Sequence, residues 1–350
     1  MDFVASVNAK KLQESYLGFV IVKPIENSNG EPVIGRSILK PYSPQVGAEK
    51  RFFVKGKNYV SFFGLPFVIE SLPFQMQDQR VGGCATITLW SALHPLCDTF
   101  GTLRHSPAEI TELATLFPSE FRAFPSSGLN LPQMINYVRS IGLDIEVIKN
   151  VEVAHTAVKG YIKEAKLPLI AALILEGKAD RGLHAVVISG YRCDSEGEVK
   201  ELYVHDDQIG PYSRVKPNGN FKVWGNEWND RGYEVILEKL LVPIYPKIRL
   251  TFARINRYYI KMKERIKARR PDLNLELYLT SIQEYKKFLL QNRIKDKTKV
   301  LTMSLPRFVW IIRAHKDPNQ PLWDKIYDGT STFVRVYRRE DLLPTIEYET

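Results

Sequence analysis

The chain has 350 residues, of which 44% are hydrophobic and 25% are charged, so it has the composition of a folded protein long enough for more than one domain. Its three cysteines, Cys84, Cys97 and Cys193, are too few for a disulfide framework, and the odd number favours a reducing compartment. The N-terminal segment lacks the apolar core of a signal peptide, and no segment has the roughly 18 uninterrupted apolar residues of a membrane span. We therefore expect a soluble, cytoplasmic protein.

The net charge of +10 raises the question of a nucleic-acid partner. Much of the excess lies in the segment RLTFARINRYYIKMKERIKARRP (249–271), which has the pattern of a basic helix. Its aromatic residues Phe252, Tyr258 and Tyr259 can form the apolar stripe of that helix instead of stacking on bases. Nothing else in the sequence supports nucleic-acid binding.

The first 70 residues are predicted to be β-structure, because their segments are rich in Val, Ile, Phe and Tyr and are interrupted by Asn, Gly and Pro. The segment ENSNGEP (26–32) is predicted to be a hairpin turn. The expected strands lie in YLGFVIVKPI (16–25), PVIGRSILKPY (32–42), KRFFVKGKNYVSFFG (50–64) and LPFVIE (65–70).

From Gly83 the hydrophobic period becomes that of a helix. The second predicted helix has a capping box formed by Ser106 and Glu109, with a proline at its first position. The four predicted helices are CATITLWSALHPLCDTF (84–100), SPAEITELATLF (106–117), NLPQMINYVRSIG (130–142) and HTAVKGYIKEAK (155–166).

Buried strands follow the helices, and this order indicates an α+β fold rather than alternating α/β. The predicted strands are LPLIAALIL (167–175), LHAVVISGYRC (183–193), VKELYVHDD (199–207) and YEVILEKLLVPIY (233–245). Beyond them we expect the basic helix, a second helix in SIQEYKKFLLQNR (281–293), and β-structure in VLTMSLPRFVWIIRA (300–314) and STFVRVYRR (331–339).

One cysteine lies directly behind a glycine pair, in the segment QMQDQRVGGCATITLWSAL (75–93). Cys84 is predicted to begin a helix, where unpaired backbone amides and the helix dipole favour a thiolate. Gly82 and Gly83 permit a tight turn and let a substrate approach the sulfur. A glutamine upstream can aim its amide at the oxyanion that forms when a thiolate attacks a carbonyl. This setting indicates a nucleophilic cysteine.

Among the six histidines, His184 is the one that begins an apolar run, two residues after the Arg181–Gly182 pair. A ring at that place can act as the base that a cysteine nucleophile needs. The base in turn needs an acceptor that orients it. The next predicted strand ends in Asp206, on the same face as Leu202 and Val204. We expect the two strands to be antiparallel neighbours.

The series of Cys84 at a helix start, His184 beginning a strand and Asp206 ending the next one resembles papain-like cysteine peptidases. It is closest to the branch that includes the bacterial peptidases that cleave double-glycine leader peptides. Within residues 70–240 the segments PFQMQD, AEITELA, GLNLPQMINYVRSIG, KLPLIAAL and DDQIG resemble segments of that branch in the same order. The resemblance lies in the ordered series rather than in any single motif.

This resemblance implies an α+β, papain-like fold, in which a helical lobe with the nucleophile helix packs on an antiparallel β-sheet. We expect a β-rich N-terminal region (1–70), a peptidase domain (71–245) and a basic α/β C-terminal region (246–350). The implied activity is hydrolysis of a peptide or isopeptide bond through an acyl-enzyme, with a peptide or protein as substrate.

The sequence departs from the family pattern at three places. Ala85 follows the nucleophile where glycine is common. Gln77 and Gln79 flank the usual position of the oxyanion-hole glutamine, and Gln77 is favoured because it belongs to the "QD" lead-in. Asp207 stands where proline is usual, which makes it a rival to Asp206, although the alternation of faces favours Asp206.

Other interpretations remain open at the sequence level. An acyltransferase or transglutaminase uses the same triad, and a catalytically silent basic adaptor could keep the same fold. His205 beside the two aspartates suggests a metal site, but the spacing matches no structural zinc pattern and neighbouring strand residues point to opposite faces. We therefore expect no metal and no cofactor. Cys97 and Cys193 lie in apolar segments and are expected to be structural.

Overall fold

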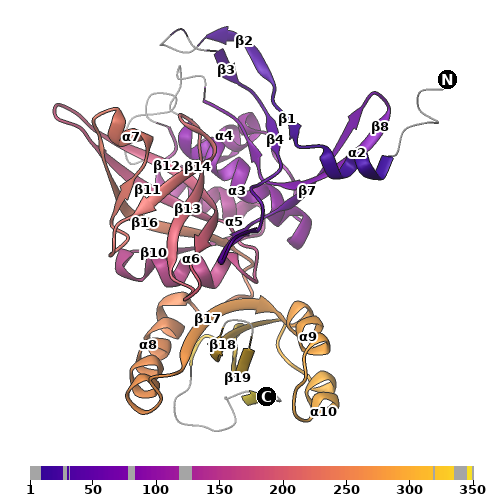
Figure 1. The fold of residues 1–350 in the computed structure, drawn as a ribbon. Helices are drawn as coiled ribbons and strands as arrows, with labels where there is room; N and C mark the ends of the chain where they lie inside the picture. Colours follow the sequence, from indigo (N-terminus) through magenta and orange to yellow (C-terminus); the bar gives the residue numbers. More distant parts are fainter. Residues whose placement is uncertain are drawn as a thin grey trace.

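The structure is a computed structural model that describes residues 9–26, 30, 32–77, 83–117, 128–317, 320–334 and 345–348. Its largest sheet has nine antiparallel strands within these residues: β5 (Gln45–Val46), β6 (Glu49–Phe53), β10 (Asp144–Ile148), β11 (Leu169–Glu176), β12 (Arg181–Cys193), β13 (Val199–Asp206), β14 (Gly210–Pro217), β15 (Val223–Gly225) and β16 (Glu234–Ile244). Because β11 pairs with both β12 and β16, the six strands β11 to β16 close into a ring, which we call the strand ring (Figure 1).

Strand β12 belongs to two pairings along its length. Its residues 181–188 pair with β11, and its residues 190–193 pair with β6 from the N-terminal region. Gly190 makes the second pairing fit, because a Cβ there would lie 2.5 Å from the Phe52 carbonyl oxygen and 2.5 Å from the Phe53 ring. The chain before residue 71 therefore contributes strands to the same sheet as the strand ring.

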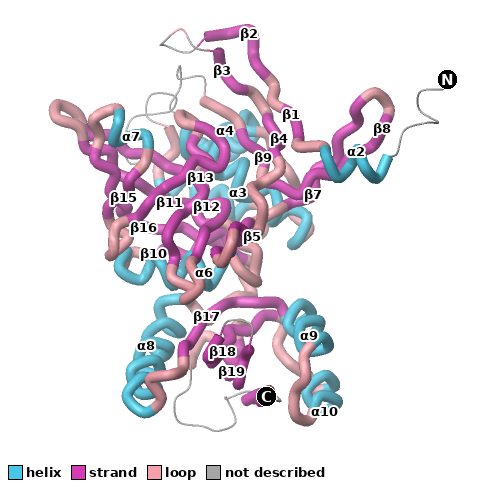
Figure 2. The backbone as a smooth tube through the Cα atoms, in the orientation of Figure 1, coloured by secondary structure: helices cyan, strands magenta, loops and turns pink. Residues whose placement is uncertain are grey.

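The main helix, α3, packs against β11 and β12 (Figure 2). Every residue from Ala85 to Cys97 in it is buried, as expected of a helix that is covered on all sides. The helical elements of this half are α3 (Cys84–Phe100), α4 (Pro107–Thr115), α5 (Leu131–Ser140), the 3-10 helix η1 (Val151–Val153), α6 (Ala154–Ile162) and α7 (Glu227–Asp230).

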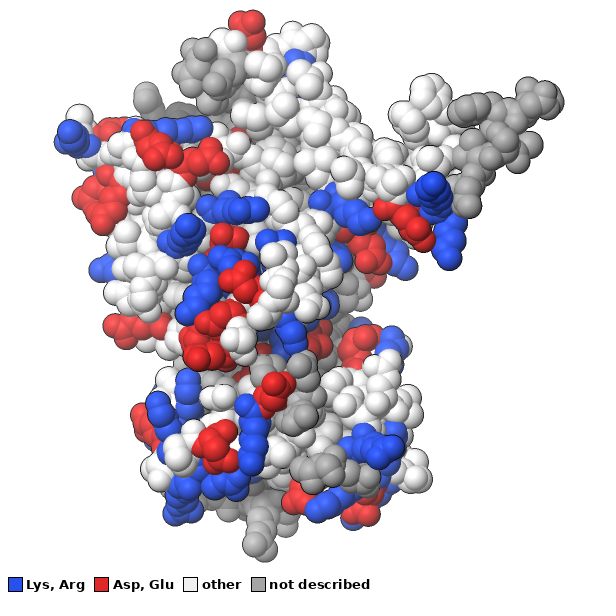
Figure 3. Space-filling view, in the orientation of Figure 1, with Lys and Arg blue, Asp and Glu red and all other residues white. Residues whose placement is uncertain are grey.

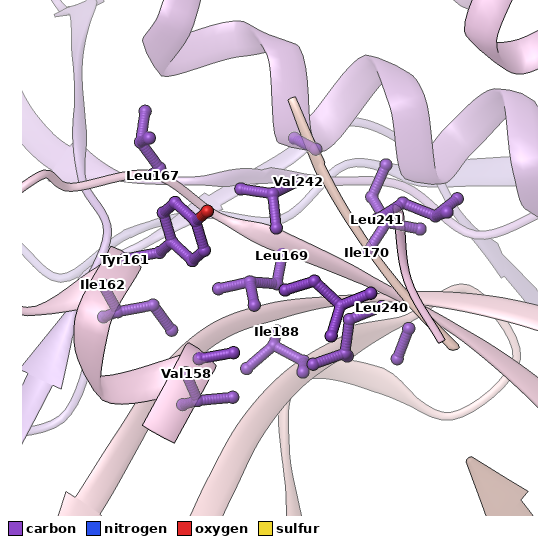
Figure 4. Close-up of a cluster of buried hydrophobic side chains, with 14 of the residues drawn as sticks. Val158, Tyr161, Ile162, Leu167, Leu169, Ile170, Ile188, Leu240, Leu241 and Val242 are labelled. Carbon is purple, nitrogen blue, oxygen red and sulfur yellow. The ribbon is translucent and has the colours of Figure 1, made fainter. Parts of the chain in front are cut away.

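Side chains from α6 and the strand ring form a continuous apolar core (Figure 4). Each is at most 2% exposed: Val158, Tyr161, Ile162, Leu167, Leu169, Ile170, Ile188, Leu240, Leu241 and Val242. Burial of each such aliphatic side chain contributes about 1.5–3 kcal/mol. This core holds the strands that carry the candidate site.

The N-terminal region begins with a helix and two hairpins. Helix α2 (Ala9–Ser15) is tied to β8 through the Gln13 amide, which donates to Val68 O at 2.8 Å and accepts from Val68 N at 2.9 Å. The strands of this region are β1 (Gly18–Phe19), β2 (Val22–Glu26), β3 (Pro32–Ile34), β4 (Ser37–Leu39), β7 (Gly56–Phe62), β8 (Leu65–Ser71) and β9 (Pro73–Phe74). The β7–β8 turn places Phe63 and Gly64 at positive φ.

A second, four-stranded sheet with three helices forms what we call the C-terminal unit, at the bottom of Figure 1. Its elements are α8 (Phe252–Arg269), β17 (Asn274–Ser281), α9 (Ile282–Gln291), α10 (Lys297–Thr302), β18 (Phe308–Asp317), β19 (Gln320–Asp328) and β20 (Thr345–Glu347). An ion pair joins it to α6, with Lys163 Nζ 2.7 Å from Glu276 Oε2. Gly160 permits the close approach of β17, because a Cβ there would lie 3.3 Å from Leu277 O.

Most of the predicted elements are confirmed, including the helix over 84–100 and the antiparallel pairing of β12 with β13. The β2–β3 hairpin is confirmed by its pairing, although residues 27–29 and 31 of its turn lie outside the described residues. The prediction of β-structure for the first 70 residues is wrong for residues 9–15, which form helix α2.

Two predictions in the C-terminal region need correction. Residues 300–302 belong to α10 instead of a strand, because Val300 is buried and Lys297 Nζ bonds to the Leu290 and Asn292 carbonyls, so tertiary packing overrides β propensity. Residues 331–334 form no strand, and residues 335–339 of that predicted segment lie outside the described residues.

The basic segment forms α8, and its rings are engaged in packing. Phe252 and Tyr259 are buried, and Tyr258 contacts Tyr327 at a ring distance of 5.5 Å, which confirms the apolar-stripe interpretation. In Figure 3 the Lys and Arg side chains of the visible face are interspersed with Asp and Glu. No helix in the described residues is long and apolar enough to cross a membrane.

Candidate active site

Cys84 is the first residue of α3 and is partly exposed, whereas Cys97 and Cys193 are buried. Gly83 is the N-cap residue and has no side chain with which to cap the helix. The N-cap residue therefore leaves the amides of the first turn open, and the positive end of the helix dipole lies at the sulfur. This arrangement favours negative charge next to Cys84.

A hydrogen bond fixes α3 beside the strand that carries His184. Thr88, one helical turn after Cys84, donates from Oγ1 to Ala185 O at 2.9 Å. Ala185 is the direct neighbour of His184 in β12. The Cys84 thiol lies near enough to the His184 ring to act on its ionisation: burial lowers the pKa of His184, and Asp206, Cys84 and Asp207 raise it. The sulfur and the imidazole are therefore neighbours.

Asp206 lies at the end of β13 and holds the other side of the imidazole. His184 Nε2 is 3.0 Å from Asp206 Oδ1, and each side chain is 1% exposed. Since Nε2 is bonded to the carboxylate, Nδ1 is the ring nitrogen left to exchange a proton with the thiol. The three side chains form a Cys–His–Asp series at the junction of α3, β12 and β13.

The buried pair favours a protonated imidazole. Burial is the largest influence on His184 and lowers its pKa, but the charge and hydrogen bond of Asp206, with the contacts to Cys84 and Asp207, raise the pKa well above its usual value. Burial also acts to raise the pKa of Asp206, and the imidazole and hydrogen bonds from Trp228 and Gln208 lower it overall. The site can therefore stabilise an imidazolium beside a thiolate.

Trp228 is a site residue that the sequence did not reveal. Its Nε1 donates to Asp206 Oδ2 at 2.8 Å, and its ring centroid lies 5.5 Å from that of His184. Gln208 N donates to Asp206 Oδ1 at 3.0 Å. No sequence signal linked Trp228, in the segment WGNEWND (224–230), to Asp206. The chain runs from Asp206 through β14 and β15 of the strand ring to α7, and this path returns the Trp228 indole to Asp206.

Asp207 lies close to the same ring but does not bond it directly. Its Oδ1 is 3.8 Å from His184 Nε2, compared with 3.0 Å for Asp206 Oδ1. Burial is the main reason that the pKa of Asp207 is raised to about 7. Of the two carboxylates, Asp206 is the one in hydrogen-bond contact with the imidazole.

The upstream glutamine lies beside the aspartates. Gln77 N donates to Asp207 O at 3.4 Å, which fixes the backbone of residue 77 next to the end of β13. Gln79 and Gly82 belong to residues 78–82 and lie outside the described residues. Ala85 is buried within α3, so the helix accepts the alanine without disturbance.

Ligand atoms of His184, Asp206 and Asp207 lie within 4.8 Å of one another, which is the grouping of the described residues closest to a metal site. Asp206 already accepts hydrogen bonds from His184, Trp228 and Gln208, so its oxygens are engaged by protein donors. His205 lies on the opposite face of β13, where its ring contacts Tyr212 at 4.6 Å. His205 therefore does not belong to the metal site that the sequence suggested as an alternative.

Cavity size alone does not point to this site. A cavity of about 560 Å³ lies between the strand ring and the C-terminal unit, and its lining comes from α6, α8, β17 and the β12–β13 turn. It does not include Cys84, His184 or Asp206. The chemistry of the side chains therefore identifies the candidate site.

No family model and no curated protein matches the chain. Among solved structures, the peptidase domain of Streptococcus ComA, a bifunctional ABC transporter in a quorum-sensing pathway, is similar at 14% identity and a TM-score of 0.29, covering 49% of this chain and 95% of that domain. A double-glycine-motif protease from an AMS/PCAT transporter, solved with its leader peptide, is similar at 12% identity and a TM-score of 0.27, covering 57% and 99%. TM-scores this low carry no argument, so the geometry of the site has to do so.

Proposed function

We propose that the protein is a cysteine peptidase that hydrolyses a peptide or isopeptide bond through Cys84, His184 and Asp206. The observation that supports this most strongly is the contact series from the sulfur at the start of α3 through the imidazole to the buried carboxylate. A structural cysteine has no need of a buried His–Asp pair beside it. The proposal extends the family resemblance of the sequence to these three side chains.

In the proposed mechanism His184 takes the Cys84 proton, and the thiolate attacks the carbonyl carbon. A tetrahedral oxyanion forms, and the Cys84 backbone amide and the Gln77 side chain stabilise it. The imidazolium then protonates the leaving nitrogen as the C–N bond breaks and the acyl-enzyme remains. Water adds to the thioester with His184 as base, which releases the acid and restores the thiol.

Selective alkylation tests the nucleophile without knowledge of the substrate. We expect iodoacetamide, or an epoxide inhibitor, to modify Cys84 much faster than Cys97 and Cys193, because burial raises the pKa of both other thiols. Peptide mass spectrometry after timed exposure measures the three rates. Equally slow labelling of all three cysteines would contradict the proposal.

The control separates activation from exposure. H184Q removes the base and leaves Cys84 accessible, so the rate at Cys84 should fall about 10- to 100-fold while those of Cys97 and Cys193 stay the same. An unchanged rate in H184Q would mean that exposure alone explains the labelling. Adding an amine to a peptide reaction distinguishes hydrolysis from acyl transfer, since a transferase forms the amide product.

A further inference from the structure

A second buried carboxyl group beside the candidate triad has no role in the mechanism above. Asp207 is 3% exposed, and its Oδ1 lies 3.8 Å from His184 Nε2. Neither of its carboxylate oxygens has a hydrogen-bond partner in the described part of the chain. A buried carboxyl that accepts no hydrogen bond is unusual, because its desolvation is offset here only by the longer-range charge of His184.

Within the described residues, few groups face the Asp207 side chain. From β12 and β13 the charged groups are His184 and Asp206, and these are the two that act on its ionisation. Cys84 of α3 acts on the His184 ring and is not among the groups that act on Asp207. From α7 the side chain at the site is the indole of Trp228, while Glu227 and Asp230 are exposed. His205 lies on the other face of β13, with its ring against Tyr212.

We propose that Asp207 is a second positioning carboxylate for the imidazole, which supports the protonated form of His184 once Asp207 is ionised. The distance of 3.8 Å is short enough for a strong charge interaction between two buried side chains. Asp206 orients the ring through a hydrogen bond, and Asp207 adds charge without competing for that bond. This inference deepens the proposed function, on which its catalytic meaning rests.

The consequence is a site that responds to pH near neutrality. Burial, opposed by His184 and aided by Asp206, raises the pKa of Asp207 to about 7. Below this pH Asp207 is neutral and Asp206 alone supports the imidazolium. Above it, the added negative charge keeps His184 protonated to higher pH, so the imidazolium that must protonate the leaving group persists into the alkaline range.

Histidine NMR on the full chain tests this directly. The His184 ring signal, assigned by its loss in H184Q, is followed from acid to alkaline pH in wild type, D207N and D230N. We expect D207N to lower the pKa of His184 by about one unit. D230N makes the same chemical change at an exposed site nearby and should leave the His184 titration unchanged.

Wild-type protein provides a second readout that needs no variant. Its His184 signal should show an additional inflection near pH 7 as Asp207 ionises. Identical His184 titrations in wild type and D207N would overturn the inference; if D207N does not fold, the absence of the inflection in wild type would do so. A response to D207N in a protein whose Cys84 is unreactive would refute the peptidase and leave the role of Asp207 standing.

Discussion

At the scale of single residues, the carboxylate of Asp206 decides whether the imidazole is held. It receives three donors, from His184, Trp228 and Gln208, and is fully buried. Hydrogen bonds to a buried charge contribute about 1.5–3 kcal/mol, more than bonds between neutral groups. Trp228 therefore acts on the thiol through two intermediates, Asp206 and His184.

Replacing Trp228 tests that chain of contacts. W228F keeps a large ring and removes the Nε1 donor, so the carboxylate loses one of the bonds that fix its position against the imidazole. We expect the Cys84 alkylation rate to fall about 3- to 10-fold.

The matched control is W224F, since Trp224 is also buried and donates from Nε1 to Phe221 O at 3.0 Å. It should lower the thermal unfolding temperature without slowing alkylation of Cys84. If both variants slow alkylation equally, loss of core packing would be the cause, and the link from Trp228 to the thiol would be wrong.

At the scale of elements, the docking of α3 on β12 sets the distance between thiol and imidazole. Cys84 lies on α3 and His184 on β12. The Thr88–Ala185 bond joins these elements one helical turn after Cys84 and one residue after His184. A second hydroxyl, Ser91 Oγ, donates to Pro73 O at 2.7 Å and fixes the same helix to the N-terminal strands. The hydrogen bonds of Thr88 and Ser91 thus restrict translation and rotation of α3 relative to β12 and the N-terminal strands.

T88V should loosen this docking, because valine has the shape of threonine but cannot donate. We expect a loss of about 1 kcal/mol in the free energy of unfolding and a fall in the alkylation rate of Cys84. Chemical denaturation and timed labelling measure the two effects.

T86V provides the comparison on the same helix, where Thr86 Oγ1 meets Thr111 Oγ1 of α4 at 3.2 Å. T86V should lower the free energy of unfolding and leave the alkylation rate of Cys84 unchanged. If Cys84 in T88V is alkylated at the wild-type rate, apolar packing alone holds α3 in place.

The sequence predicted most of the site because its local signals agree with the fold. Glycine before Cys84, the apolar run after His184 and the polar end of the strand at Asp206 are all local patterns. Trp228 and the choice between the two aspartates depend on strand pairing and on the side-chain distances, which no local pattern contains. The helix at 297–302 was missed for a related reason, since its burial against α9 is a tertiary effect.

At the scale of the whole molecule, the C-terminal unit is joined to the strand ring through a buried charge. Glu276 of β17 pairs with Lys163 of α6 at 2.7 Å, and the two side chains are 11% and 18% exposed. Burial acts to raise the pKa of Glu276, but Lys163 and Lys159 outweigh it and lower the pKa to about 2 from 4.5. The folded carboxylate is thus more acidic than the unfolded one.

The stability that this pair adds is therefore present above pH 4.5 and is lost as the pH falls from 4.5 towards 2. E276Q should cost on the order of 3 kcal/mol at neutral pH, and this difference from wild type should disappear in strong acid. Urea unfolding at several pH values measures it.

Glu284 offers a control, because its pair with Lys287 is exposed, with side chains 55% and 57% accessible. E284Q should change the free energy of unfolding little at any pH. A constant difference between E276Q and wild type across the acid range would show that the carboxylate charge is not what joins the two parts.

The pairing of β6 with β12 gives the N-terminal segment a part in the sheet that holds His184. Where Gly190 lets Phe52 and Phe53 approach, the backbone of β12 depends on a strand that precedes the nucleophile in the chain. The segment up to Phe53 is therefore an integral part of the sheet. Replacing it would expose the edge of β12 at residues 190–193 to solvent and to pairing with other strands.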